Sequence, residues 1–142
     1  MRVVIDTNCL VASISPEGGY YWLYEAFETE QFEWLISNEI LTEYFEKLTD
    51  LYSEQTALLV YSIISTAVNV TFTEPFFKWQ LVEADPDDNK FADLVVAGNV
   101  DYLVTNDRHF NLLKILDFPK LTIVSLDEFK KVIENNVRHN FV

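Results

Sequence analysis

The sequence predicts an α/β fold built around a five-stranded parallel sheet. Five short apolar runs alternate with segments of helical periodicity, a pattern typical of parallel strands joined by right-handed crossovers. The first run, Val3 to Ile5, has three branched apolar residues in succession, which indicates a strand buried on both faces. We expect this strand to be the central one.

The composition indicates one globular domain over residues 1–142. Hydrophobic residues make up 49% and aromatic residues 15% of the chain, enough for a sizeable core. No stretch reaches the roughly 20 apolar residues of a membrane span, and we see no secretory signal at the start. The single cysteine, Cys9, can form no internal disulfide, which favours a small core residue in a reducing cytoplasm.

The net charge of −13 is unevenly distributed. Residues 1–88 hold 16 acidic and 3 basic residues, whereas residues 89–142 hold 7 of each. A negative protein repels nucleic acid, so the composition argues against proteins that bind phosphates by bulk electrostatics. A polyanion would have to approach over the C-terminal third of the chain or through metal ions.

The segment after the first strand begins with a loop at residues 15–19, where proline and paired glycines interrupt the pattern. Aromatic residues then recur at helical spacing and predict a helix over residues 20–30, with its aromatic stripe in the core or in a subunit interface. A short apolar run at residues 32–37 predicts the second strand.

Two helices and the third strand follow. Ser37 or Asn38 is expected to cap a helix that runs to about Leu51. A helix over residues 53–68 is apolar on most of its circumference, so we expect it to be buried or to contact another subunit. Residues 70–72 form the predicted third strand.

Residues 84–89, Ala-Asp-Pro-Asp-Asp-Asn, contain three aspartates in four positions. Asp87 or Asp88 is expected to cap a helix over residues 90–98, where an acidic first turn also suits the helix dipole. Capping requires only one of them. Asp93 lies inside the otherwise apolar part of this helix, where a carboxylate needs a partner or a cation.

A fourth strand is expected over residues 102–105. It ends in small polar residues and an aspartate, Asp107, as the first strand does at Asp6. The remaining predicted elements are a short helix at residues 110–116, a fifth strand at residues 121–125 and a helix capped by Asp127 that runs to about Asn136.

Asp6, which precedes Thr7 and Asn8, has two interpretations. It is either a helix cap or a ligand-binding carboxylate, because open α/β sheets bind ligands at the carboxyl ends of their strands. If the first and fourth strands are neighbours, Asp6 and Asp107 face one crevice, and Asp88 can open onto the same edge.

Three other candidate residues have ordinary interpretations as well. Glu43 lies about 130° from the middle of the apolar stripe of its helix, so it either leans over the sheet edge or is a solvated glutamate. His109 and His139 lack the spacing of a metal-binding pair, and we expect each to be a surface or core histidine.

Four carboxylates close together would raise one another's pKa unless cations neutralised them. A ligand set of oxygen atoms suits Mg²⁺ or Mn²⁺, which keep several waters and bind phosphates directly. Ions of this kind generate a nucleophile for in-line displacement in nucleases, and they present positive charge to a phosphate inside an acidic pocket.

Four stretches of the sequence together resemble the PIN-domain ribonucleases: Val-Val-Ile-Asp-Thr-Asn at the N-terminus, Glu43, the segment 85–91 and the segment 102–107. The chain is most similar to the bacterial PIN-family toxins of toxin–antitoxin systems related to VapC. The resemblance implies a three-layer α/β/α fold with sheet order 3-2-1-4-5 and Mg²⁺ or Mn²⁺ dependence. It also implies cleavage of single-stranded RNA, a homodimer and inhibition by a cognate antitoxin protein.

The resemblance assigns roles to seven residues. The catalytic and metal-binding positions correspond to Asp6, Glu43, Asp88 and Asp107, the supporting polar positions to Asn8 and Thr105, and an additional acid to Asp93.

Two other enzyme classes fit poorly. A haloacid-dehalogenase-like phosphatase needs a second aspartate where Asn8 stands, and a response-regulator receiver needs an aspartate at the end of a middle strand. The main alternative is a catalytically inactive PIN fold that acts as a binding module through protein partners.

Overall fold

The structure, a computed structural model, describes residues 1–82 and 85–140, with side chains up to residue 138. Five strands form one parallel sheet in the order β3-β2-β1-β4-β5, as predicted. The strands are β1 (Arg2–Ile5), β2 (Glu33–Ile36), β3 (Val70–Phe72), β4 (Tyr102–Val104) and β5 (Ile123–Val124).

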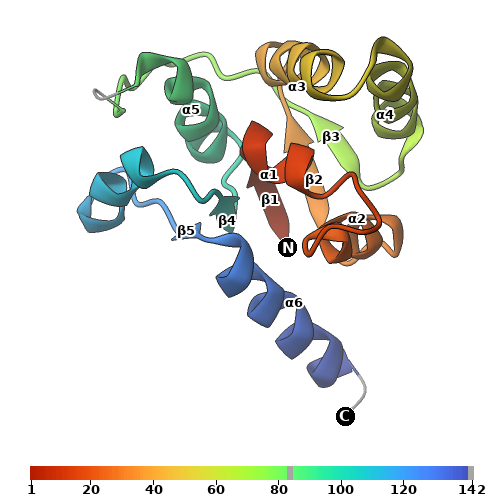
Figure 1. Cartoon of the computed structure of the whole chain (residues 1–142). Helices are drawn as coiled ribbons and strands as arrows, with labels where there is room; N and C mark the ends of the chain where they lie inside the picture. Colours follow the sequence, from red (N-terminus) through yellow and green to blue (C-terminus); the bar gives the residue numbers. More distant parts are fainter. Residues whose placement is uncertain (83–84, 141–142) are drawn as a thin grey trace.

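Helices cover both faces of the sheet, which confirms the three-layer α/β/α arrangement. Figure 1 shows α3, α4 and α5 on one side and α2 and α6 on the other. The helices are α1 (Thr7–Ala12), α2 (Tyr21–Glu28), α3 (Asn38–Leu51), α4 (Glu54–Thr66), α5 (Asn89–Ala97) and α6 (Leu126–Asn140). Two 3₁₀ segments, η1 (Pro86–Asp88) and η2 (Arg108–Ile115), precede and follow the α5–β4 unit.

The central position of β1 explains its composition. This strand pairs with β2 on one side and with β4 on the other, and Val3, Val4 and Ile5 are buried as predicted. Ile5 lies opposite Val104 in the register of β1 with β4. Both strands therefore end at the same level, and the polar residues that follow them meet at one edge of the sheet.

Two predictions about helix caps were wrong in detail. Asp88 occupies the N-cap position of α5 but makes no capping hydrogen bond, whereas Asp85 caps η1 through the backbone N–H of Asp87 at 3.2 Å. The last helix begins earlier than expected. Its start is a capping box in which Ser125 and Glu128 each accept the other's backbone N–H at 3.1 Å, so Asp127 is not the cap.

Two other predicted helices also differ. The helix expected at residues 110–116 is the 3₁₀ segment η2, which begins at Arg108, ends at Ile115 and is capped by Asp107 through the backbone N–H of His109. α4 is capped by Ser53, and its apolar circumference is not uniformly buried, since Leu58 and Leu59 are more than half exposed. None of the helices in the described part of the chain is long and apolar enough to cross a membrane.

Candidate metal centre

The ends of β1 and β4 bring Asp6 and Asp107 to one place. The backbone N–H of Asp6 donates to the carbonyl oxygen of Val104 at 2.9 Å, which continues the ladder one residue past the strands. The Thr105 hydroxyl donates to Asp6 Oδ2 at 2.8 Å and accepts the backbone N–H of Asp107 at 3.0 Å. One buried hydroxyl thus holds both strand ends in register.

Asp6 is a buried carboxylate whose surroundings disfavour its ionised form. Only 5% of the residue is exposed, and it makes no side-chain capping bond to α1, which leaves its carboxylate available to the site. Burial raises the pKa of Asp6 to about 6, with further increases from Asp107 and Glu43, although hydrogen bonds from Thr105 and Thr7 act in the opposite direction.

Asp88 completes a cluster of like charges. Burial raises the pKa of Asp88 to about 7, and the neighbouring carboxylates of Asp6, Asp85 and Asp107 add to the increase. The Oδ2 atom of Asp88 is buried and has no hydrogen-bond partner among the described residues. We call Asp6, Asp85, Asp88 and Asp107 the acidic cluster. An unpartnered buried carboxylate oxygen among like charges fits a divalent cation.

Glu43 lies beside the acidic cluster, which agrees with the first of its two interpretations from the sequence, but it already has a cationic partner. Its carboxylate accepts the Thr7 hydroxyl, and its Oε1 atom lies 3.0 Å from Lys90 Nζ. The Lys90 side chain is only 9% exposed. Among the described residues, Glu43 is therefore the one predicted ligand that is paired with a lysine or arginine.

Two residues beside the predicted ligands escaped the sequence analysis. His109 Nδ1 lies 3.4 Å from Asp107 Oδ1, 3.8 Å from Asp88 Oδ2 and 3.9 Å from Asp85 Oδ2. Asp85 also contributes an oxygen to this group. His109 follows Asp107 by two positions in the sequence, and this spacing would have indicated it as a candidate ligand. It was missed because only a pair of histidines was considered. The prediction for His139 concerns a side chain outside the described residues.

A family model for the PIN domain matches residues 2–109. The chain belongs to the PIN domain family. PIN domains are typically nucleases, and the acidic cluster of this PIN domain contains the ligand types of a metal site. No match was found among curated protein sequences.

Solved structures that share the fold include the following three. A chain of VapBC from Salmonella typhimurium, solved bound to DNA, has a TM-score of 0.62 and 18% identity over 89% of this chain and 98% of its own. A chain of VapBC2 from Rickettsia felis, bound to a DNA fragment from its promoter, has a TM-score of 0.61 and 18% identity over 88% of this chain and 98% of its own. The RRP44 PIN domain of T. brucei has a TM-score of 0.52 and 12% identity over 98% of this chain and 84% of its own.

The supporting residues of this PIN domain have different environments. Thr105 lies within the site, as described above. Asp93 is buried and accepts the backbone N–H of Trp79 at 3.0 Å, so the partner that its burial requires is a backbone group. Asn8 is exposed and forms no side-chain hydrogen bond with the described residues.

Thr105→Val should destabilise the protein by about 1–3 kcal/mol, because it leaves the buried Asp6 carboxylate and the Asp107 N–H without their shared partner. Valine has nearly the same shape as threonine, so the core packing is retained. Urea unfolding measures the difference, with Thr105→Ser as the control that keeps the hydroxyl. Equal stability of the valine variant and the wild type would show that the bridge is unimportant.

Proposed function

We propose that this PIN domain is a metal-dependent endoribonuclease that cleaves single-stranded RNA, and that it is the toxin of a type II toxin–antitoxin pair related to VapC. The observation that carries the proposal is the convergence of Asp6, Asp88 and Asp107 at the edge of the sheet. Two of these carboxylates have raised pKa values and one has a buried, unpartnered oxygen. A hydrolytic site built on divalent cations needs such a group of oxygen ligands.

In this proposal Asp6, Glu43, Asp88 and Asp107 hold Mg²⁺ or Mn²⁺. When bound, the ion would supply an activated water as nucleophile and stabilise the leaving oxygen of the phosphodiester. Thr105 orients Asp6 and Asp107 through its two hydrogen bonds. Lys90 keeps the charge of Glu43 balanced while the site is free of metal.

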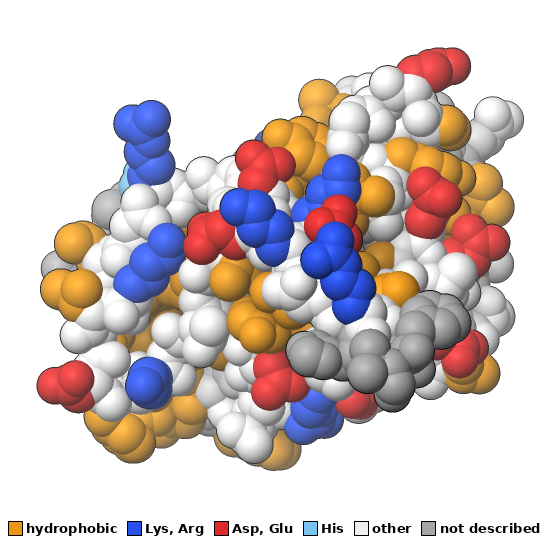
Figure 2. All heavy atoms as spheres, turned by 90° about the horizontal axis from the view of Figure 1, so that it is seen from below, with side chains coloured by type: hydrophobic (Ala, Val, Ile, Leu, Met, Phe, Trp, Pro, Cys, Tyr) orange, Lys and Arg blue, Asp and Glu red, His pale blue; other side chains and the backbone are white. Residues whose placement is uncertain are grey.

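The surface charge supports approach of RNA through the metal rather than over a basic surface. The net charge of the chain is −13. Figure 2 shows the side of the molecule where β1 begins, away from the acidic cluster, and there Lys and Arg side chains are interspersed with Asp and Glu and do not form a continuous basic area. A phosphate entering an acidic cluster would be repelled without a cation between the two.

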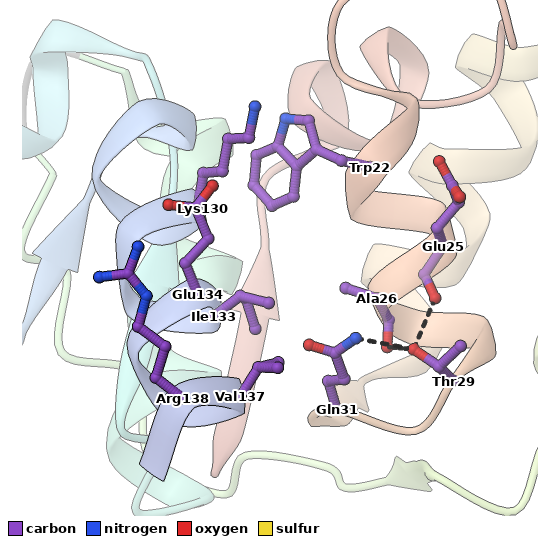
Figure 3. Close-up of a pocket in the computed structure, with 10 residues that line it drawn as sticks. All are labelled: Trp22, Glu25, Ala26, Thr29, Gln31, Lys130, Ile133, Glu134, Val137 and Arg138. Atoms are coloured by element: carbon purple, nitrogen blue, oxygen red, sulfur yellow. Dashed lines mark hydrogen bonds between the residues drawn. The ribbon is translucent and has the colours of Figure 1, made fainter. Parts of the chain in front are cut away.

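Exposed apolar surface supports the two proposed protein partners, which are a cognate antitoxin protein and a second copy of the chain. A groove of about 490 Å³ lies between α2 and α6, and Figure 3 shows Trp22, Ile133 and Val137 turned toward it, with Lys130 and Arg138 at its edge. Both VapBC structures with the same fold are complexes. An RNA substrate and an antitoxin together imply a cytoplasmic location.

The experiment is hydrolysis of a labelled single-stranded RNA in Mn²⁺. We expect cleavage by the wild type, none in chelator, and none by Asp6→Asn, because asparagine keeps the shape of Asp6 without its charge. Asp127→Asn is the matched control, since Asp127 is an exposed aspartate at the start of α6. No cleavage by either the wild type or Asp6→Asn would favour the alternative, an inactive PIN fold that acts through protein partners.

A further inference from the structure

A nitrogen donor lies among the carboxylates at one side of the acidic cluster. The His109 imidazole, Asp85, Asp88 and Asp107 each offer a ligand atom, and these four atoms lie within 4.8 Å of one another. They come from two segments, the η1 segment before α5 and the turn after β4. We call this set the His109 subsite. Three carboxylates and one imidazole are a sufficient ligand set for a divalent transition ion.

The second observation is the unpartnered oxygen of Asp88. Asp88 is 8% exposed, and its Oδ2 atom has no hydrogen-bond partner among the described residues. His109 Nδ1, at 3.8 Å, is beyond hydrogen-bond distance. Buried carboxylate oxygens are normally satisfied by a donor or a cation, so this atom points to a missing ligand at the centre of the His109 subsite.

The neighbouring hydrogen bonds orient the other ligands. Asp85 Oδ1 accepts the backbone N–H of Asp87 at 3.2 Å, which leaves Asp85 Oδ2 free on the side of His109. Asp107 Oδ1 accepts the backbone N–H of His109 at 2.9 Å and thereby fixes the turn that carries the imidazole. Such outer hydrogen bonds are typical supports of metal ligands. The His109 side chain is 46% exposed, so an ion can reach it from solvent.

We propose that Asp85, Asp88, Asp107 and His109 bind one divalent transition ion, with the His109 nitrogen making the subsite prefer Mn²⁺ or Co²⁺ over Mg²⁺. This inference rests on the proposed function and names the class of metal that the site takes. Mg²⁺ binds oxygen ligands almost exclusively, whereas imidazole strengthens binding of later first-row ions. Asp88 and Asp107 are shared with the proposed catalytic set, and Asp85 and His109 belong to this subsite alone.

Calorimetric titration of the untagged, metal-free full chain with Co²⁺ and with Mg²⁺ tests the proposal. We expect His109→Gln to weaken Co²⁺ binding at least ~tenfold, the lower limit for losing even an indirect metal contact, and to change Mg²⁺ binding much less. Asp85→Asn keeps an oxygen for the Asp87 N–H and should weaken binding of both ions. His139→Gln, which alters the only other histidine, should bind as the wild type does.

Proton NMR gives a second readout on the same samples. With only two histidines in the chain, the imidazole signals can be assigned by comparing His109→Gln with His139→Gln. Bound Co²⁺ should displace the His109 ring signals from the diamagnetic range and leave those of His139 there. Undisplaced His109 signals at saturating Co²⁺, or wild-type Co²⁺ affinity in His109→Gln, would overturn the proposal.

Neither readout depends on RNA cleavage. A wild type that binds Co²⁺ through His109 but cleaves no RNA would keep the subsite and remove the nuclease. A wild type that cleaves RNA while His109→Gln retains full Co²⁺ affinity would keep the nuclease and remove the subsite.

Discussion

Asp6→Asn should stabilise the metal-free protein by ~3 kcal/mol near pH 8. The pKa of Asp6 in the folded protein is about 6, against an ordinary value of 3.8, because the carboxylate is buried near Asp107 and Glu43. A pKa difference of one corresponds to ~1.4 kcal/mol, so ionising Asp6 in the folded protein lowers the free energy of unfolding by ~3 kcal/mol. Asparagine removes the charge and keeps an oxygen that accepts the Thr105 hydroxyl.

The effect of Asp6→Asn has a defined pH dependence. Between pH 3.8 and 6 the folded wild type binds more protons at Asp6 than the unfolded chain does, so its stability falls as the pH rises through this range. The advantage of the variant is therefore fully present above about pH 6 and disappears below about pH 4. Asp88, whose pKa is raised to about 7, adds a fall of the same sign at higher pH in both proteins.

Urea unfolding in chelator near pH 4 and pH 8 measures these differences, with Asp127→Asn as a matched control that removes an exposed charge. If Asp6→Asn is less stable than the wild type near pH 8, Asp6 is stabilised by its surroundings and the repulsion that motivates a metal site does not exist.

Lys90→Met should destabilise the metal-free protein by about 2 kcal/mol. The Lys90 ammonium is 3.0 Å from Glu43 Oε1 and nearly buried, so its removal leaves the Glu43 carboxylate close to Asp6 without a cation. Breaking a fully buried pair typically costs ~3–5 kcal/mol, and a smaller value is expected here because the Glu43 side chain is 26% exposed. Methionine preserves most of the aliphatic volume of Lys90.

A double-mutant cycle with Glu43→Gln isolates the pair. The double variant should recover most of the loss in chelator, because no unbalanced carboxylate remains. Millimolar Mn²⁺ should stabilise Lys90→Met more than it stabilises the wild type, since the ion takes over the neutralisation of Glu43. Equal gains in the two proteins would place Glu43 outside the cation site.

The sheet and the edge where the candidate site lies could be predicted because they follow from local patterns. Consecutive apolar residues mark buried strands, and the polar residues that end β1 and β4 must meet once these strands are neighbours. The convergence of Asp6 and Asp107 was predicted in this way, from their position in the sequence, whereas Thr105 was indicated only by the resemblance to PIN domains. The adjacency of the Asp6 and Asp107 side chains is set by backbone geometry and needs no knowledge of packing.

The partners of individual side chains could not be predicted, because they depend on tertiary packing. Nothing local indicates that Lys90 reaches Glu43 on another helix or that Asp93 holds the backbone of Trp79. Cap assignment failed for a related reason. Pro86 starts a 3₁₀ turn that Asp85 caps, which frees the Asp88 carboxylate for the cluster.

The wrong prediction for α6 has a local cause. Ser125 and Glu128 form a reciprocal capping box across the start of the helix, and this signal is stronger than that of Asp127 alone. The exposed face of α4 is a different case. Its apolar residues indicated burial, but whether another chain covers Leu58 and Leu59 is decided by assembly and not by the fold of one chain.

Carboxylates from distant parts of the chain are proposed to share one divalent cation. The most direct test is thermal or urea unfolding of the wild type and Asp107→Asn, each in chelator and in millimolar Mn²⁺. The asparagine can still cap η2, so the fold is preserved. We expect Asp107→Asn to be the more stable protein in chelator. In Mn²⁺ the wild type should gain ~2.7 kcal/mol at 100 times the dissociation constant, and the variant should gain little. An Asp107→Asn protein that gains as much from Mn²⁺ as the wild type does would contradict the account.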